Sequence, residues 1–200
     1  MAKIIKISPK EKLVKYLIEN KGPHSIRAVS GAIAIDYKST YNVVHKLAPE
    51  VISQDKLGNT NLIRIKLSPN REIYSVEKRR AEELLNNQPK LRIIKKYTEE
   101  MNYPFLILLV FGSYARKNSS EKSDVDLCLI SDSSSKSEQL IKKLNLLSLK
   151  MDIHKFTTNE FISMIEKTTP NLGHEIVKNN VILYGIENYY NLVSKWMKKD

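Results

Sequence analysis

The sequence holds little cysteine and no long apolar run. Its 200 residues include one cysteine, Cys128, which excludes a disulfide within the chain. No run reaches the roughly 18 consecutive apolar residues of a membrane-spanning helix, so we expect no membrane partner. Residues 1–6 lack the apolar stretch of a secretory signal peptide. These absences predict a cytoplasmic protein.

Positive charge is unevenly distributed along the chain. The formal net charge is +11. Residues 1–90 hold 17 Lys and Arg against 9 Asp and Glu, a balance of +8, whereas residues 91–200 hold 16 against 13, a balance of +3. A basic module indicates a polyanionic partner, most often a nucleic acid. We therefore expect nucleic-acid contacts in the first half of the chain.

The first half carries the pattern of three short helices followed by two strands. Apolar periodicity predicts helices over residues 8–20, 25–33 and 37–47, then strands over 51–54 and 62–67. The Gly58-Asn59 pair suits the tight turn of a hairpin. By this pattern the segment resembles the winged helix-turn-helix family. The chain is then divided into a winged-helix domain over residues 1–74, a helical linker over 75–89 and a second domain over 90–200.

The resemblance makes the third helix the recognition helix, which would enter the major groove of double-stranded DNA. Tyr41, Val44 and Leu47 are expected to face inward. The outward residues, which would contact DNA, are Lys38, Ser39, Thr40, Asn42, His45 and Lys46, joined beside the turn by Lys56 and Arg64. Many such proteins are dimers, so a homodimer is one expectation. The alternative for this module is a protein-docking role.

The linker contains a short basic run, Lys78-Arg79-Arg80. Charged runs on helices usually face solvent, so we interpret it as a solvated helix face. Phosphate contact is the alternative for this run.

The most informative motif begins with Gly112-Ser113, directly after the apolar run 105–111. Glycine lets the backbone approach a phosphate closely and adopt positive φ. A helix that starts here would offer its N–H groups to an anion. Arg116, within one turn, could contact a phosphate or pair with an acid. The motif predicts a nucleotide site at Gly112, Ser113 and Arg116.

After ten intervening residues, Ser113 is followed by two acids at i and i+2, Asp124 and Asp126. Side chains at this spacing on a strand point the same way. Two carboxylates held so close raise each other's pKa, and a divalent cation relieves the repulsion. Magnesium commonly takes one or two carboxylates together with substrate phosphate oxygens. The pair therefore predicts a magnesium site beside a nucleoside triphosphate.

This order of residues resembles the minimal nucleotidyltransferases of the polymerase-beta-like superfamily. Their motif is Gly-Ser, roughly ten residues, then Asp-x-Asp, commonly in the form Gly-Ser-x-Ala-Arg-Gly. Here Ala115-Arg116 fits that form, whereas Lys117 stands where the family usually has glycine. The family uses a third carboxylate on a later strand. Asp152 is the candidate, in a stretch of alternating polarity over residues 149–156.

The resemblance implies both a fold and a reaction. The fold class would be α+β or α/β, with a mixed sheet flanked by helices behind the N-terminal module. Asp124, Asp126 and Asp152 would hold one or two magnesium ions. The enzyme would move a nucleoside monophosphate, from ATP first among the triphosphates, onto a hydroxyl of a protein or nucleic-acid acceptor. Some members of the family act in toxin–antitoxin pairs.

Two other functions remain open at this point. The chain could be a non-catalytic transcriptional regulator, in which the second domain senses a nucleotide or docks a partner. The substitution of Lys117 for glycine keeps that alternative open. The chain could also modify RNA, with the basic module gripping the RNA. The sequence does not name the acceptor, the base preference or the operator.

Overall fold

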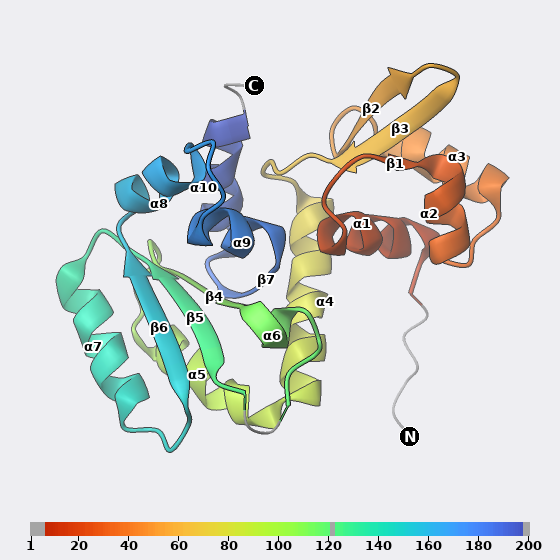
Figure 1. The fold of residues 1–200 in the computed structure, drawn as a ribbon. Coiled ribbons are helices and arrows are strands. Elements are labelled where there is room, and N and C mark those ends of the chain that lie inside the picture. The colour runs from red at the N-terminus through yellow and green to blue at the C-terminus, as the bar shows by residue number, and fades with distance from the viewer. Residues whose placement is uncertain (1–6, 121–122, 198–200) are drawn as a thin grey trace, which may run out of the picture. The chain divides into compact units, whose positions relative to one another are not determined.

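The computed structural model describes residues 7–120 and 123–197 of the chain, shown as a ribbon in Figure 1. Residues 1–6, whose sequence lacks a signal-peptide core, lie outside this description. The chain divides into two compact units, Met1–Val76 and Glu77–Asp200. Within the described residues, every helix is too short or too polar to cross a bilayer.

The first unit contains three helices and three strands. In chain order these are α1 (Pro9–Glu19), β1 (His24–Ser25), α2 (Ile26–Ala32), α3 (Tyr37–Leu47), β2 (Ile52–Leu57) and β3 (Thr60–Ile65). Each helix begins where a short polar side chain accepts a backbone N–H three residues on. Ser8 caps α1, Ser25 caps α2 and Asp36 caps α3. The Asp36 cap accepts from Ser39 N–H at 2.8 Å, and this bond holds the pKa of the carboxyl below its ordinary value.

The strands of the first unit form an antiparallel sheet in the order β1-β3-β2. Strands β2 and β3 pair up to Leu57 and Thr60, so the turn is Gly58 and Asn59 as the sequence predicts. Gly58 has φ +58°, the conformation that such two-residue turns require. The strands extend further toward the turn than the apolar pattern alone indicates.

The second unit begins within helix α4 (Arg71–Asn87), which runs across the boundary between the units. It continues through η1 (Pro89–Leu91), α5 (Arg92–Glu100), β4 (Ile107–Phe111), α6 (Gly112–Ala115), β5 (Val125–Ile130), α7 (Ser134–Asn145), β6 (Met151–Phe156), α8 (Thr158–Ile165), α9 (Leu172–Lys178), β7 (Asn180–Tyr184) and α10 (Ile186–Met197).

The four strands of the second unit form a mixed sheet in the order β6-β5-β4-β7. Strand β4 is antiparallel to β5 and β7, whereas β5 and β6 are parallel. Helices flank the sheet, as Figure 1 shows, and this confirms the mixed sheet that the family resemblance implied. The core under α5 and α7 takes Val125, Leu127 and Leu129 from β5. Because side chains alternate along a strand, Asp126 belongs to the opposite face.

A buried polar network contradicts the predicted solvation of one residue of the Lys78-Arg79-Arg80 run, while Lys78 is exposed as predicted. Arg80 is buried and its Nη1 lies 2.5 Å from Glu77 Oε2. Tyr190 Oη donates to Glu77 Oε1 at 2.6 Å, and Arg80 Nη2 donates to the Asn180 carbonyl at 2.8 Å. Burial raises the pKa of the Tyr190 hydroxyl, and the Glu77 charge raises it further. The run therefore supplies one core residue, because a buried acid one turn earlier compensates its charge.

Candidate active site

The candidate site starts where β4 ends and α6 begins. Gly112 has φ +63°, a conformation that few residues other than glycine adopt. A Cβ placed on Gly112 would lie 1.9 Å from Asp126 Oδ2. The backbone thus passes against the Asp126 carboxylate, at a distance that only glycine allows. This contact brings the two halves of the predicted motif together in one place.

The second feature is a pair of carboxylates on neighbouring strands. Asp126 in β5 is the register partner of Asp152 in β6. Parallel strands lie about 4.8 Å apart, so the two side chains leave the same face side by side. Asp126 is half-buried and Asp152 is exposed. Burial raises the pKa of Asp126, the Asp152 charge raises it further, and the Ser113 backbone N–H partly offsets both effects.

Asp124 lies one residue before β5 begins and is exposed. Within residues 7–120 and 123–197, no group of three or more His, Cys, Asp or Glu side chains is gathered closely enough to hold a metal ion. Two neighbouring carboxylates, of which Asp126 has a raised pKa, lie beside a backbone cradle that a Cβ would fill. This set still fits magnesium, which takes its remaining ligands from phosphate oxygens and water.

Two further residues join the site that sequence reasoning left unassigned. His154 Nε2 lies 3.1 Å from Asp152 Oδ2, and its ring packs 5.6 Å from the Phe111 ring. Glu175, in the first turn of α9, accepts from Arg116 Nη1 at 2.9 Å. The two-residue spacing from Asp152 is a signal for His154. The sequence holds no comparable signal for Glu175, which is 59 residues from Arg116.

Lys117 has a left-handed backbone conformation, which favours glycine. Its φ is +59°. Lys117 N–H donates to the Tyr114 carbonyl at 3.3 Å, and Asn118 N–H donates to the Ser113 carbonyl at 3.1 Å. These two bonds form the Schellman motif that ends α6, in which glycine is usual. The turn that follows the Gly112-Ser113 motif is therefore built here without glycine, at a backbone cost of roughly 1–2 kcal/mol.

On α3, the structure corrects the predicted contact face. Thr40, expected to face outward, is buried at 1% exposure, and Tyr41, expected to face inward, is 38% exposed. The buried positions are Thr40, Val44 and Leu47, which follow the helical repeat. The Thr40 hydroxyl donates to the Asp36 carbonyl at 3.0 Å, which satisfies its polar group inside the core.

The other predicted DNA-contacting residues keep their side chains near the surface of the first unit. Ser39 is half-buried, and those classed as exposed are Lys38, Asn42, His45, Lys46, Lys56 and Arg64. Arg64 Nη2 lies 2.6 Å from Asp55 Oδ2 across the hairpin. The Tyr41 ring lies 6.1 Å from the Tyr37 ring and 4.3 Å from the His45 ring. The exposed face of α3 thus carries an aromatic row between basic residues.

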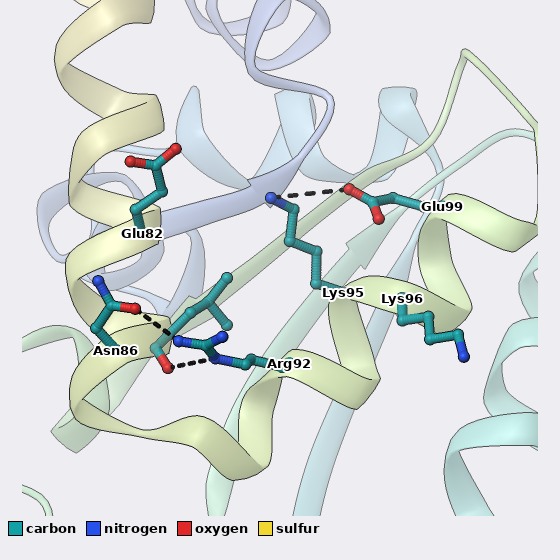
Figure 2. Close-up of a pocket in the computed structure, with 7 residues that line it drawn as sticks. Glu82, Asn86, Arg92, Lys95, Lys96 and Glu99 are labelled. Atoms are coloured by element: carbon teal, nitrogen blue, oxygen red, sulfur yellow. Dashed lines mark hydrogen bonds and ion pairs between the residues drawn. The ribbon is translucent and has the colours of Figure 1, made fainter.

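A hollow of about 320 Å³ lies between α4 and α5. Figure 2 shows its lining, which is formed by Glu82, Leu85, Asn86, Arg92, Lys95, Lys96 and Glu99. Arg92 donates to the Leu85 carbonyl and to Asn86 Oδ1, and Lys95 pairs with Glu99. The candidate acids, Gly112 and Arg116 are absent from this lining. The hollow is therefore separate from the candidate active site.

Comparison with known proteins gives one match. Residues 92–189 match the family model described as Polymerase beta, Nucleotidyltransferase. No curated protein and no solved structure matches the chain. The matched segment contains Gly112, Ser113, Arg116, the three candidate acids and Glu175. The match supports the polymerase-beta-like superfamily for this segment and indicates nucleotidyl transfer as its class of reaction. It does not extend to the first unit.

Proposed function

We propose that this protein transfers a nucleoside monophosphate from a nucleoside triphosphate onto a hydroxyl group of a protein or nucleic acid. ATP is the first candidate for the triphosphate. One observation carries the proposal: the glycine turn lies against Asp126, whose register partner is a second carboxylate, Asp152. Triphosphate transfer needs a phosphate cradle beside carboxylates, and a glycine turn that lies against one of two neighbouring carboxylates supports this function.

Asp126 and Asp152, with Asp124 nearby, would hold one or two magnesium ions. When bound, magnesium neutralises charge on the phosphates and supports their displacement. The raised pKa of Asp126 supports this role, because its causes include repulsion by Asp152, which a cation relieves. Asp124 would reach the site from the loop before β5.

The protein's own groups supply positioning. The backbone at Gly112 and Ser113 would cradle the terminal phosphates, and Arg116 would pair with a phosphate oxygen. The acceptor hydroxyl oxygen would form a bond to the α-phosphorus while the bond from that phosphorus to the bridging oxygen breaks. Pyrophosphate leaves, and the hydroxyl proton passes to the Asp152 carboxylate. The gain in rate would come mainly from orientation and preorganised charge.

A labelling experiment tests this proposal. The purified protein is incubated with magnesium, each of the four α-labelled triphosphates and lysate of its source cell. We expect one nucleotide to label a protein or RNA band. The label should be lost in Asp126→Asn and kept in Glu138→Gln, which removes an exposed acid on α7. A labelled band that survives Asp126→Asn would contradict the assignment.

We also propose that the first unit is a winged helix that binds double-stranded DNA. The exposed residues of α3 and the hairpin support this, as does the charge of residues 1–76, which hold 13 Lys and Arg against 6 Asp and Glu, a balance of +7. Lys38, Ser39, Asn42, His45, Lys46, Lys56 and Arg64 form the proposed contact surface. Competition between duplex DNA and structured RNA tests it. Preference for RNA would instead favour an RNA-modifying enzyme.

A second function follows if the second unit does not turn over. In that case the chain would be a DNA-binding regulator that senses a nucleotide, and Lys117 in the phosphate turn is the observation that favours it. A sensor binds triphosphate and leaves it whole, whereas an enzyme releases pyrophosphate. Whether the second unit is an enzyme or a sensor, its fusion to a DNA-binding unit would suit an operon that regulates itself, as in toxin–antitoxin pairs. A homodimer would match an operator with two-fold symmetry.

A further inference from the structure

The Arg116–Glu175 pair joins the phosphate turn to a distant helix. Arg116 is the residue that caps the end of α6, and Glu175 lies in the first turn of α9. Their side chains meet at 2.9 Å and are 41% and 47% exposed. An approaching ligand can therefore reach both partners. The residue proposed to hold a phosphate is thus already held by an acid of the same unit.

Glu175 is fixed in this position by the packing of α9 on α8. Asn171 caps α9 and its Nδ2 donates to the Met164 carbonyl at 2.8 Å. The His174 ring nitrogen lies 3.0 Å from the Ile165 carbonyl. A Cβ on Gly173 would lie 2.9 Å from Met164 Cγ, so the two helices approach closely. The start of α9 is therefore tied to α8 on both sides of Gly173, and Glu175 is presented from a rigid support.

Glu175 also lies near the carboxylates of the site. Its charge is among the causes that raise the pKa of Asp126. His154 pairs with Asp152 at 3.1 Å, and Arg116 pairs with Glu175. Arg116 is thus already matched to an acid. A triphosphate that enters the site brings negative charge that competes for the same guanidinium group.

We propose that Glu175 takes the place of a triphosphate oxygen on Arg116, and that nucleotide binding displaces it. The guanidinium group binds carboxylate and phosphate oxygens with the same N–H donors, so the two anions compete for it. Glu175 is then a positioning residue that keeps Arg116 at the turn and lowers nucleotide affinity. Its release would free the Glu175 side chain when nucleotide is bound, while the start of α9 stays tied to α8. This inference rests on the proposed nucleotide site.

The direction in which nucleotide affinity changes when Glu175 is replaced distinguishes competition from the other roles of this residue. If Glu175 competes with nucleotide, its removal tightens binding. If Glu175 instead helped to hold a magnesium ion or only supported the fold, its removal would weaken binding. Exposed ion pairs contribute little free energy, so we expect a decrease in the Kd for ATP of about two- to fivefold.

The experiment measures ATP binding by the full chain in magnesium, by titration calorimetry, for the unmodified protein and Glu175→Gln. Removing any negative charge near the site would also favour an anion, so Arg116→Gln and the double variant are measured too. Competition predicts that Glu175→Gln tightens binding when Arg116 is present and has no effect in the Arg116→Gln background. Glu187→Gln, an exposed first-turn acid of α10, is the matched control and should leave the Kd unchanged.

Each outcome decides the matter. Unchanged or weaker binding by Glu175→Gln, or tightening that persists in the Arg116→Gln background, would overturn this inference and leave the proposed function standing. If the unmodified protein binds no triphosphate, both fall. If Glu175→Gln does not fold, Glu175→Asp keeps an acid at this position with a shorter reach. We then expect a smaller decrease in Kd, and no decrease would overturn the inference.

Discussion

Asp126 and Asp152 are register partners on the parallel strands β5 and β6. Strand pairing alone thus places two carboxylates side by side, although 26 positions separate them in the sequence. Gly112 is the third component of this site, because its backbone lies against Asp126. The candidate site is therefore fixed by the sheet and by one glycine, which makes it testable by single substitutions.

Removing the Asp126 charge should abolish transfer and stabilise the fold. Burial and the Asp152 charge raise the pKa of Asp126 above its ordinary value of 3.8. Between pH 3.8 and that raised pKa, the folded state holds more protons than the unfolded state, so Asp126 lowers stability as the pH rises through this window. We expect Asp126→Asn to have a higher Tm at pH 7, and the difference to shrink below pH 3.8. Thermal unfolding at several pH values measures this.

Gly112 should tolerate no side chain. In Gly112→Ala the new Cβ would meet Asp126 Oδ2 at 1.9 Å, at a φ of +63°. The conformation alone costs roughly 1–2 kcal/mol, and the contact adds to it. We expect lower stability in urea unfolding and loss of transfer. Gly31→Ala is the control, because Gly31 lies in α2 with open space around it and should be neutral or stabilising. Equal effects at both glycines would contradict the close approach.

Lys117→Gly should stabilise the protein without abolishing activity. Glycine adopts the left-handed conformation of residue 117 without the cost that lysine carries, so we expect a gain of about 1 kcal/mol. Lys117→Ala retains a Cβ and should give little or no gain. Urea unfolding compares the two. A loss of stability in Lys117→Gly would show that lysine contributes more through its side chain than its backbone costs.

On α3, substitution of a buried residue should change stability alone, and substitution of an exposed residue should change DNA affinity alone. Thr40→Val removes the buried hydrogen bond to the Asp36 carbonyl and should cost about 1 kcal/mol of stability, with DNA affinity unchanged. Asn42→Ala changes an exposed residue, so stability should hold while affinity falls by about 1–3 kcal/mol if Asn42 contacts a base. Thermal unfolding and DNA titration at fixed salt measure both. Weaker DNA binding by folded Thr40→Val would contradict the corrected face.

The sequence predicts most readily what depends on near neighbours along the chain. The Gly112-Ser113 turn, the acid spacing and the Gly58-Asn59 hairpin all follow from local backbone chemistry. Identifying Asp152 as a site residue required the family resemblance. Strand pairing places it beside Asp126, and the local sequence does not reveal that pairing. Glu175 was missed since no local pattern marks a contact 59 residues away.

Burial of polar side chains was the other source of error. Arg80 belongs to a basic run, yet the buried Glu77 draws it into the core. Thr40 faces inward and Tyr41 outward, the reverse of the prediction. The Thr40 hydroxyl donates a hydrogen bond to the Asp36 carbonyl one turn earlier, which allows its burial, whereas the Tyr41 ring packs against exposed neighbours. In both cases the deciding contact is a hydrogen bond, ion pair or ring contact that hydrophobic periodicity does not register.

The central claim is that the site formed by Gly112, Asp126 and Asp152 carries out nucleotidyl transfer. The most direct measurement is magnesium-dependent pyrophosphate release from ATP, in the presence of source-cell lysate, by the unmodified protein, Asp126→Asn, Asp152→Asn and Glu138→Gln. We predict release by the unmodified protein and Glu138→Gln only. Release that persists in both aspartate variants, or triphosphate binding without any release by the unmodified protein, would contradict the claim.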